Sequence, residues 1–243
     1  MRQTSFNGIT LRENDGSLCL GTDSLLCAAY MRSHSRDRGV ELGCGSGVIS
    51  LLLLSRDKIG SVCGLEIDEH SARLCAENIN GNGLSDRMTV KREDIRLLSP
   101  AEHQGISVVY ANPPYMRVGA GKECLSPSAE NARHEHSGGI EEFCRAASRI
   151  LKTGGCFYAV YRPDRLSALM RALAEYRLSP KRMTFVHSDP FHAASSVLVE
   201  ARKDGGESLY LTPPLLLNRD GRETEELSEI YASGFFPKKY YAP

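Results

Sequence analysis

A glycine-rich turn constrains the fold of this 243-residue chain more than any other feature. The turn, Glu41 to Gly47, reads E-L-G-C-G-S-G and overlaps the end of an apolar segment, Val40 to Leu42. A second apolar segment, 48–55, follows it and predicts a helix. Glycines let the backbone approach a ligand closely, and the helix that follows points its N–H groups at that ligand. The turn therefore predicts a βα unit with a ligand site at the carboxyl end of its strand.

Segments typical of strands and helices alternate along the rest of the chain. Strands are predicted at 61–67, 88–91, 106–111 and 156–161, and helices at 68–80, 139–151 and 166–175. A glycine turn is expected at 152–155, and strands near 182–187 and 196–201 are expected to pair as a hairpin. This order indicates a doubly wound α/β sheet, mostly parallel, with an antiparallel strand late in the chain. We expect one domain over 1–243, with a core at 38–203, an N-terminal extension at 1–37 and a C-terminal extension at 204–243 that holds a helix near 224–231.

Two acidic residues stand at the ends of the next predicted strands. Glu66 follows Gly47 by about the 20 residues of a βαβ unit, where a carboxylate accepts hydrogen bonds from ribose hydroxyls. Asp94 comes after the third strand, where it could accept from a purine amino group. The turn departs from the G-x-G-x-x-G dinucleotide fingerprint because Val48 stands at its last position, which disfavours an NAD-dependent oxidoreductase. These residues together predict a nucleoside-type cofactor across the carboxyl edge of the sheet.

The tetrapeptide Asn112-Pro113-Pro114-Tyr115 follows the predicted strand 106–111 at the same edge. Asn and Pro are common in turns, but the two prolines also remove N–H donors and leave the Pro113 carbonyl as an acceptor beside the Asn112 side-chain oxygen. An exocyclic NH2 held by two acceptors has its lone pair directed at an electrophilic methyl group, so transfer needs alignment more than a strong base. Tyr115 offers a flat face for a base. We interpret the tetrapeptide as a catalytic motif for methylation of an amino nitrogen.

With these motifs the sequence resembles class I methyltransferases, and within them the bacterial tRNA1(Val) adenine-37 N6-methyltransferases. Segments that match this family are the G-T-D segment of 20–26, the turn 41–47, the motif 112–115, an A-R-H-E segment at 132–135, and Tyr210 followed by D-G-x-x-T at 220–224. The resemblance implies a Rossmann-like, seven-stranded sheet with an antiparallel last strand, S-adenosylmethionine as cofactor, and tRNA as substrate. It assigns the catalytic role to Asn112, Pro113, Pro114 and Tyr115, and cofactor binding to Thr22, Asp23, Glu41, Gly43, Gly45, Gly47, Glu66, Asp94 and Asn112.

Three alternatives keep the fold and change the function. Enzymes with this motif also methylate the glutamine amide of release factors, although the N-terminal 40 residues leave little room for the helical domain those enzymes usually carry. Others methylate guanine N2 in rRNA. A non-catalytic RNA-binding module is disfavoured because Asn112, Pro113 and Tyr115 are present together with the glycine turn and Glu66.

The composition mainly argues against other kinds of site and partner. Lys+Arg and Asp+Glu balance at 30 each, so net charge gives no support for a nucleic-acid partner, although basic groups occur at 32–38 and 117–136. None of the eight cysteines forms a C-x-x-C pair, and His134 and His136 do not share a helix face, so we expect no metal. The longest apolar run, Val48 to Leu54, is too short to cross a bilayer, and we expect a cytoplasmic protein without membrane contact. The oligomeric state is left open.

Overall fold

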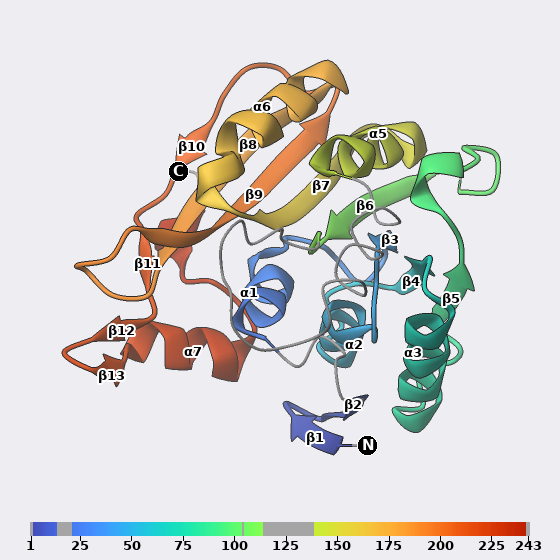
Figure 1. The fold of residues 1–243 in the computed structure, drawn as a ribbon, viewed down its shortest axis with the longest axis horizontal. Helices are drawn as coiled ribbons and strands as arrows, with labels where there is room; N and C mark the ends of the chain where they lie inside the picture. The colour runs from blue at the N-terminus through green and yellow to red at the C-terminus, as the bar shows by residue number, and fades with distance from the viewer. Residues whose placement is uncertain (1, 14–20, 104, 114–138, 242–243) are drawn as a thin grey trace, which may run out of the picture.

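A nine-stranded sheet forms the centre of the molecule (Figure 1). The computed structural model describes residues 2–13, 21–103, 105–113 and 139–241. The strands of the sheet are β3 (Arg38–Leu42), β4 (Ser61–Glu66), β5 (Met88–Arg92), β6 (Ile106–Ala111), β7 (Leu151–Tyr161), β8 (Leu178–His187), β9 (Ala194–Lys203), β10 (Tyr210–Leu211) and β11 (Leu215–Leu216). They lie in the order β10-β8-β9-β7-β6-β3-β4-β5, and β11 also pairs with β8.

The sheet is mostly parallel, as the sequence predicts. Strands β3 to β7 pair with one another in parallel, whereas β9 is antiparallel to both of its neighbours, β7 and β8. Strands β8 and β7 therefore run in the same direction. The predicted seven strands correspond to β3–β9, and the antiparallel strand lies inside the sheet. The two-residue strands β10 and β11 extend it beyond seven because the C-terminal extension pairs with β8 in parallel.

Helices cover both faces of the sheet (Figure 1). They are α1 (Thr22–Tyr30), α2 (Val48–Ser55), α3 (Glu69–Gly81), α5 (Ile140–Ile150), α6 (Leu166–Glu175) and α7 (Glu225–Ser233), with short 3₁₀ turns η1 (Ile95–Leu97), η2 (Pro163–Arg165) and η3 (Lys238–Tyr240). One hydrophobic cluster joins α1, α2 and α7 to one face, and another joins α5 and α6 to the other. Among the described residues, no helix is long and apolar enough to cross a membrane.

The turn predicted at 152–155 is wrong. Helix α5 ends at Ile150, and Leu151 pairs at once with Ile106 of β6, so the glycines become part of β7. The register between β6 and β7 shifts between Ile106 and Val108, and Gly154 adopts a φ of +79°. An irregularity within the strand therefore takes up residues that a free turn would have used.

The N-terminal extension forms a hairpin that the sequence reading did not predict. Strands β1 (Arg2–Phe6) and β2 (Ile9–Glu13) join through Asn7-Gly8, and both turn residues have positive φ, at 48° and 82°. An Asn-Gly pair with this backbone is the favoured two-residue hairpin turn. The side chains of Ile9 and Leu11 are buried in the core, so the hairpin is packed onto the domain.

Two asparagines of α3 bind the hairpin to the domain. Asn82 accepts from the Thr10 N–H and donates to the Thr10 carbonyl, both at 2.8 Å. Asn78, one turn earlier, accepts from the Arg12 N–H at 2.8 Å and donates to the Arg12 carbonyl at 3.3 Å. Side chains four apart on a helix lie about 6 Å from each other, close to the roughly 7 Å between alternate residues of a strand. The two amides therefore act as a partner strand for β2.

A buried lysine joins the C-terminal ends of two helices. The side chain of Lys58 is 3% exposed, and its Nζ donates to the carbonyls of Ala28 and Ala29 at the end of α1 and of Gly234 after α7. Cations at helix C-termini are stabilised by the last carbonyls and the helix dipole. Lys58 therefore fixes α7 against α1.

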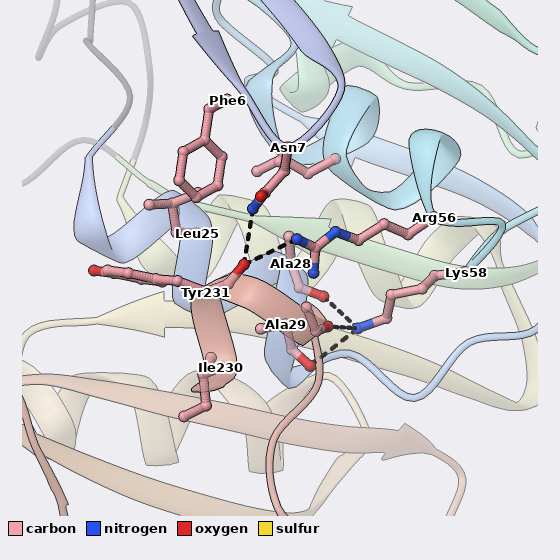
Figure 2. Close-up of a pocket in the computed structure, with 11 residues that line it drawn as sticks. Phe6, Asn7, Leu25, Ala28, Ala29, Arg56, Lys58, Ile230 and Tyr231 are labelled. Carbon is pink, nitrogen blue, oxygen red and sulfur yellow. Dashed lines mark hydrogen bonds between the residues drawn. The ribbon is translucent and has the colours of Figure 1, made fainter. Parts of the chain in front are cut away.

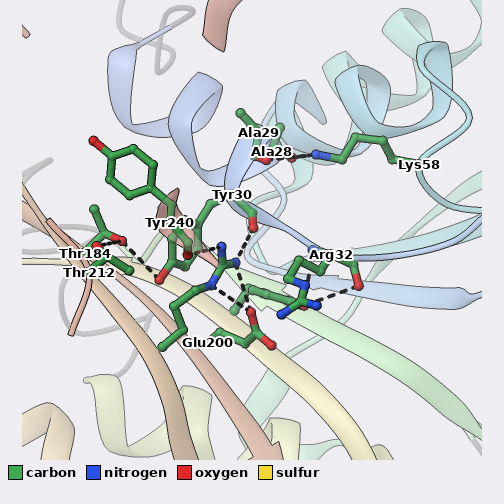
Figure 3. Close-up of polar contacts among 11 residues, drawn as sticks. Ala28, Ala29, Tyr30, Arg32, Lys58, Thr184, Glu200, Thr212 and Tyr240 are labelled. Atoms are coloured by element: carbon green, nitrogen blue, oxygen red, sulfur yellow. Dashed lines mark hydrogen bonds and ion pairs between the residues drawn. The ribbon is translucent and has the colours of Figure 1, made fainter. Parts of the chain in front are cut away.

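Tyr30, Glu200 and Tyr240 lie together near the same, C-terminal end of α1 (Figure 3), and a buried arginine of β8 joins them. Arg182 pairs with Glu200 at 2.9 Å, stacks on the Tyr30 ring, and donates to the carbonyls of Tyr30 and Tyr240. Its charge is thus balanced by a carboxylate and two carbonyls within the core. These contacts hold the C-terminal extension against the sheet.

Candidate active site

The residues predicted to bind cofactor and substrate follow adjacent parallel strands and meet at one edge of the sheet. Leu42, the last residue of β3, pairs with Leu65 of β4 on one side and with Ala111 of β6 on the other. Glu66 pairs with Arg92 at the end of β5. The glycine turn, Glu66, Asp94 and Asn112 therefore lie side by side at the carboxyl edge, where open α/β sheets bind their ligands.

All three glycines of the turn adopt left-handed backbone. Gly43, Gly45 and Gly47 have φ angles of +66°, +53° and +85°, which residues other than glycine rarely adopt. A Cβ on Gly47 would lie 2.7 Å from Cys75 Sγ, whereas a Cβ on Gly45 would have no described atom within 4 Å. The turn is therefore packed on its inner side and open at Gly45, which fits a ligand that approaches the backbone there.

Two buried cysteines fill the space beneath the turn. Cys44 Sγ lies 4.0 Å from Cys75 Sγ, and a Cβ on Gly64 would lie 2.7 Å from Cys44 Sγ. The hydrogen bond with Cys75 and burial raise the pKa of Cys44, so this thiol stays protonated. These two cysteines act as small packing groups that support the turn.

The side chain of Glu66 is hydrogen-bonded to the glycine turn, which lies next to it at the edge of the sheet. Its Oε2 accepts from the Gly45 N–H at 2.8 Å, and its Oε1 accepts from the Asp68 N–H at 3.0 Å. Burial raises the pKa of Glu66, and these hydrogen bonds oppose the shift. Each carboxylate oxygen has a second lone pair, so the geometry fits acceptance from ribose hydroxyls. That role remains a prediction.

Asp94 is paired with a residue that the sequence reading did not identify. It caps η1 by accepting from the Arg96 N–H, and its Oδ2 lies 2.6 Å from Arg96 Nη2. A purine amino group would share Asp94 with this guanidinium. The sequence does contain a signal for this pairing. An Asp that caps a helix two residues before an Arg can accept hydrogen bonds from both the backbone N–H and the guanidinium of that Arg.

Glu41 lies inside the protein, below the turn. Its carboxylate is 3% exposed and accepts from both the N–H and the hydroxyl of Ser50 on α2, and the Ser50 hydroxyl also lies 2.6 Å from the Tyr110 hydroxyl. Burial raises the pKa of Glu41 to about 8. Glu41 therefore contacts Ser50 of α2, and its role in cofactor binding stays a prediction.

Asn112 lies beside the first turn of α1, which carries Thr22 and Asp23 of the predicted G-T-D segment. Asn112 Nδ2 donates to Ser24 Oγ at 3.4 Å, and the Tyr231 hydroxyl of α7 donates to Thr22 Oγ1 at 3.5 Å. The structure thus brings the N-terminal extension to the end of β6, as the resemblance implies. Pro113 is buried, whereas Pro114, Tyr115 and the segment 132–135 lie outside the described residues.

An exposed aromatic residue stands at the same edge and was missed from sequence. Strand β8 runs in the direction of β7, so the connection after His187 lies at the carboxyl edge. Within this connection the side chain of Phe191 is 91% exposed. Nearby, Asp189 accepts from the His192 ring at 2.7 Å and from the Phe191 N–H at 2.9 Å, which orders the connection. A large exposed ring at the edge of the sheet that also carries the predicted base-binding site is a candidate substrate contact.

A small cavity lies between the hairpin turn, α1, α2 and α7 (Figure 2). Its volume of about 20 Å³ has room for a single water. The Tyr231 carbonyl at its rim accepts from Asn7 Nδ2 and Arg56 Nη2. This cavity is too small for a nucleoside.

Known proteins resemble this chain over most of its length. Residues 16–185 match the family described as methyltransferase small domain, which is well over half of the chain. The chain belongs to this family. The methyltransferase is 28% identical over 186 residues to a Bacteroides fragilis protein named tRNA1(Val) (adenine(37)-N6)-methyltransferase, covering 76% of this chain and 77% of that protein. A Bacteroides thetaiotaomicron protein of the same name is 26% identical over 236 residues, covering 97% and 92%.

Solved structures show the same fold. A predicted O-methyltransferase from Agrobacterium tumefaciens, protein Atu636, aligns with a TM-score of 0.70 and 22% identity, covering 88% of this chain and 96% of that one. TYW2 of Pyrococcus horikoshii, in complex with MeSAdo, aligns with a TM-score of 0.58 and 16% identity, covering 84% and 71%. The methyltransferase therefore has the class I Rossmann-like fold. As a member of the methyltransferase small domain family, it uses S-adenosylmethionine. The open left-handed turn at Gly45 suits a close approach of that cofactor, and the Glu66 carboxylate beside it suits the ribose.

Proposed function

We propose that the methyltransferase methylates the N6 amino group of an adenine in tRNA, with A37 of a valine tRNA as the target. The observation that carries methylation of an amino nitrogen is the position of Asn112, which follows β6 next to the glycine turn and is oriented by Ser24 of α1. The names of the relatives support tRNA adenine as the substrate.

The chemistry follows from two acceptors placed together. The Asn112 side-chain oxygen and the Pro113 carbonyl would each accept one hydrogen of the target NH2. This arrangement would turn the nitrogen lone pair toward the methyl donor and stabilise the positive charge that grows on nitrogen. Tyr115 would stack on the base, a contact worth roughly 1–3 kcal/mol in related complexes. The base must be unstacked or already extruded in a loop to reach this site.

The cofactor would lie across the turn. S-adenosylmethionine supplies the electrophilic methyl group. Gly45 would allow the close approach, Glu66 would accept from the ribose, and Asp94 would accept from the adenine amino group. Thr22 and Asp23 would close the pocket from α1, because that helix begins beside Asn112.

The same acceptors suit two other substrates. A glutamine amide and the guanine N2 amino group both present an NH2, so Asn112 and Pro113 do not distinguish them from adenine. The adenine proposal is preferred because the relatives carry that activity in their names.

Nucleoside mass spectrometry of bulk tRNA tests the proposal directly. Cells that lack the gene should lose N6-methyladenosine from a valine tRNA, and the wild-type gene should restore it while Asn112→Ala should not. Asn112→Ala protein should keep the circular dichroism spectrum and the melting temperature of the wild type, which shows that it is folded. Unchanged N6-methyladenosine would contradict the tRNA proposal, and labelling of release-factor peptide or of rRNA by the purified enzyme would then identify the substrate.

A further inference from the structure

A group of potential metal ligands lies apart from the methyl-transfer residues, where the chain after η1 folds back along the sheet. Glu93 directly follows β5, and Glu102 and His103 belong to the turn before β6. One donor atom from each of the three side chains lies within 4.8 Å of the other two. Two carboxylates and an imidazole from two segments of the chain therefore lie close together.

His103 is the residue that points to a ligand. Its side chain is 4% exposed, and its Nε2 is buried without a hydrogen bond to any described residue. The nearest charged atom is Glu93 Oε2, at 3.4 Å. A buried polar atom that lacks a partner costs about 1–3 kcal/mol, so a buried nitrogen aimed at carboxylates calls for an occupant.

We propose that Glu93, Glu102 and His103 bind a divalent transition-metal ion of the zinc class. Zinc binds imidazole nitrogen and carboxylate oxygen at about 2.0–2.2 Å, so two ligands of one tetrahedral ion lie roughly 3.4 Å apart. The distance from His103 Nε2 to Glu93 Oε2 is 3.4 Å. Glu102 is 59% exposed at its side chain and has room to swing onto the ion. A water would complete the coordination.

The ligand set also selects the class of ion. One imidazole with two carboxylates suits zinc, cobalt or manganese better than magnesium or calcium, which take oxygen ligands alone. The expectation of no metal from sequence rested on cysteine spacing and on residues 134–136. The spacing of Glu93 and His103 in the sequence matches no metal-binding motif. The two side chains meet because η1 and the turn that follows bring them together.

A neighbouring lysine occupies the outer side of the cluster. Lys91 Nζ lies 3.9 Å from Glu102 Oε2, so its ammonium competes with an ion for this carboxylate. Replacement by an uncharged residue of similar length should therefore strengthen metal binding. A bound ion would also tie the segment that carries Asp94 to the turn before β6, and would limit its movement.

Cobalt titration of the purified full chain tests the site. Co²⁺ bound by nitrogen and oxygen should give visible absorption bands without a sulfur-to-cobalt band, at one equivalent, and Zn²⁺ should displace it. His103→Asn and Glu93→Gln should each weaken binding by at least about 10-fold, since even outer-sphere changes weaken metal sites by that factor. Lys91→Met should tighten it. His192→Asn, which removes an exposed histidine paired with Asp189, is the matched control and should bind as wild type.

Two results would overturn the proposal. One is the lack of a saturable site in the wild type, and the other is a site that survives both His103→Asn and Glu93→Gln. Thermal melting without metal shows whether each variant is folded. In folded variants, Zn²⁺ should raise the melting temperature of wild type and His192→Asn and leave that of Glu93→Gln unchanged. The melting temperature does not depend on methyl transfer, so this test of the metal site is independent of the proposed tRNA substrate.

Discussion

Asn78 Nδ2 lies 3.0 Å from the main-chain carbonyl oxygen of Ser46 in the glycine turn and donates a hydrogen bond to it. The same side chain, 1% exposed, holds Arg12 of the hairpin through two further bonds. One buried amide therefore connects β2, α3 and the turn that we assign to the cofactor. A change in the hairpin can reach the cofactor site through this residue.

Asn78→Ala should weaken S-adenosylmethionine binding about 5-fold, because the loss of one net hydrogen bond to the turn costs about 1 kcal/mol in its placement. Isothermal titration calorimetry measures this directly. Asn82→Ala is the control, since Asn82 also holds the hairpin but has no bond to the turn among the described contacts. Its affinity should stay within about twofold of wild type. Equal losses in the two variants would show that hairpin docking alone matters.

Glu66→Gln should lower cofactor affinity by roughly 10- to 100-fold, since hydrogen bonds to a charged acceptor contribute about 1.5–3 kcal/mol. The amide keeps one acceptor for the Gly45 N–H, so the turn should stay formed. Calorimetric titration gives the affinity, and circular dichroism confirms the fold. Wild-type affinity in this variant would refute the ribose assignment.

Gly47→Ala and Gly45→Ala should separate folding from binding. A Cβ at Gly47 would lie 2.7 Å from Cys75 Sγ, so Gly47→Ala should destabilise the protein by about 1–3 kcal/mol in denaturant unfolding. Gly45 has open space on its Cβ side among the described atoms, so Gly45→Ala should cost only the left-handed strain of about 1–2 kcal/mol but block the cofactor. Cys75→Ala should restore part of the stability of Gly47→Ala. If it restores none, the clash is not the cause.

Glu41→Gln should change how stability depends on pH. The pKa of Glu41 is about 8 in the folded protein, against about 4.3 in an unfolded chain. Between these values the folded state holds a proton that the unfolded state releases, so this group stabilises the fold at low pH. Its contribution falls by up to about 1.4 kcal/mol per pH unit as pH rises through the window. Urea unfolding from pH 5 to 9 should show this slope in wild type and its loss in Glu41→Gln.

The contribution of Lys58 to stability has the opposite dependence on pH, and it changes over a different pH range. Burial lowers its pKa to about 7, so the unfolded state binds more protons above that pH, and stability rises from about pH 7 to 10.4. This contribution is common to wild type and Glu41→Gln and cancels in their difference. A difference that does not vary with pH would mean that Glu41 is ionised in the folded protein.

Phe191→Ala should raise the KM for tRNA roughly 10-fold, because stacking of a base on an aromatic ring contributes about 1–3 kcal/mol. Cofactor affinity should not change, since the ring is 91% exposed and lies in the β8–β9 connection. Leu211→Ala, at another exposed apolar side chain, is the control for general surface effects. An unchanged KM would remove Phe191 from the proposed substrate surface.

The periodic part of the sequence was sufficient to predict the core. The observed α2, β6 and α6 have the predicted bounds, because buried strands and amphipathic or apolar helices leave a repeating pattern. The glycine turn and Glu66 were placed correctly at the sheet edge for the same reason, since parallel strands end together.

Other features depend on contacts that no pattern reveals. The Asn7-Gly8 turn was readable as a hairpin signal, but its docking depends on Asn78 and Asn82, more than 60 residues away. Local sequence likewise could not show that Glu41 faces Ser50 or that Asp94 is held by Arg96. In each case the partner was chosen by how the elements pack, which a local pattern does not record.

The two buried basic side chains, Lys58 and Arg182, also affect how the chain folds during synthesis. Their acceptors include the carbonyls of Gly234 and Tyr240, which leave the ribosome after every strand of the sheet. A buried charge that lacks its partners costs several kcal/mol, so the nascent core stays incomplete until these residues emerge. We therefore expect ribosome-bound chains that stop before residue 234 to remain sensitive to protease.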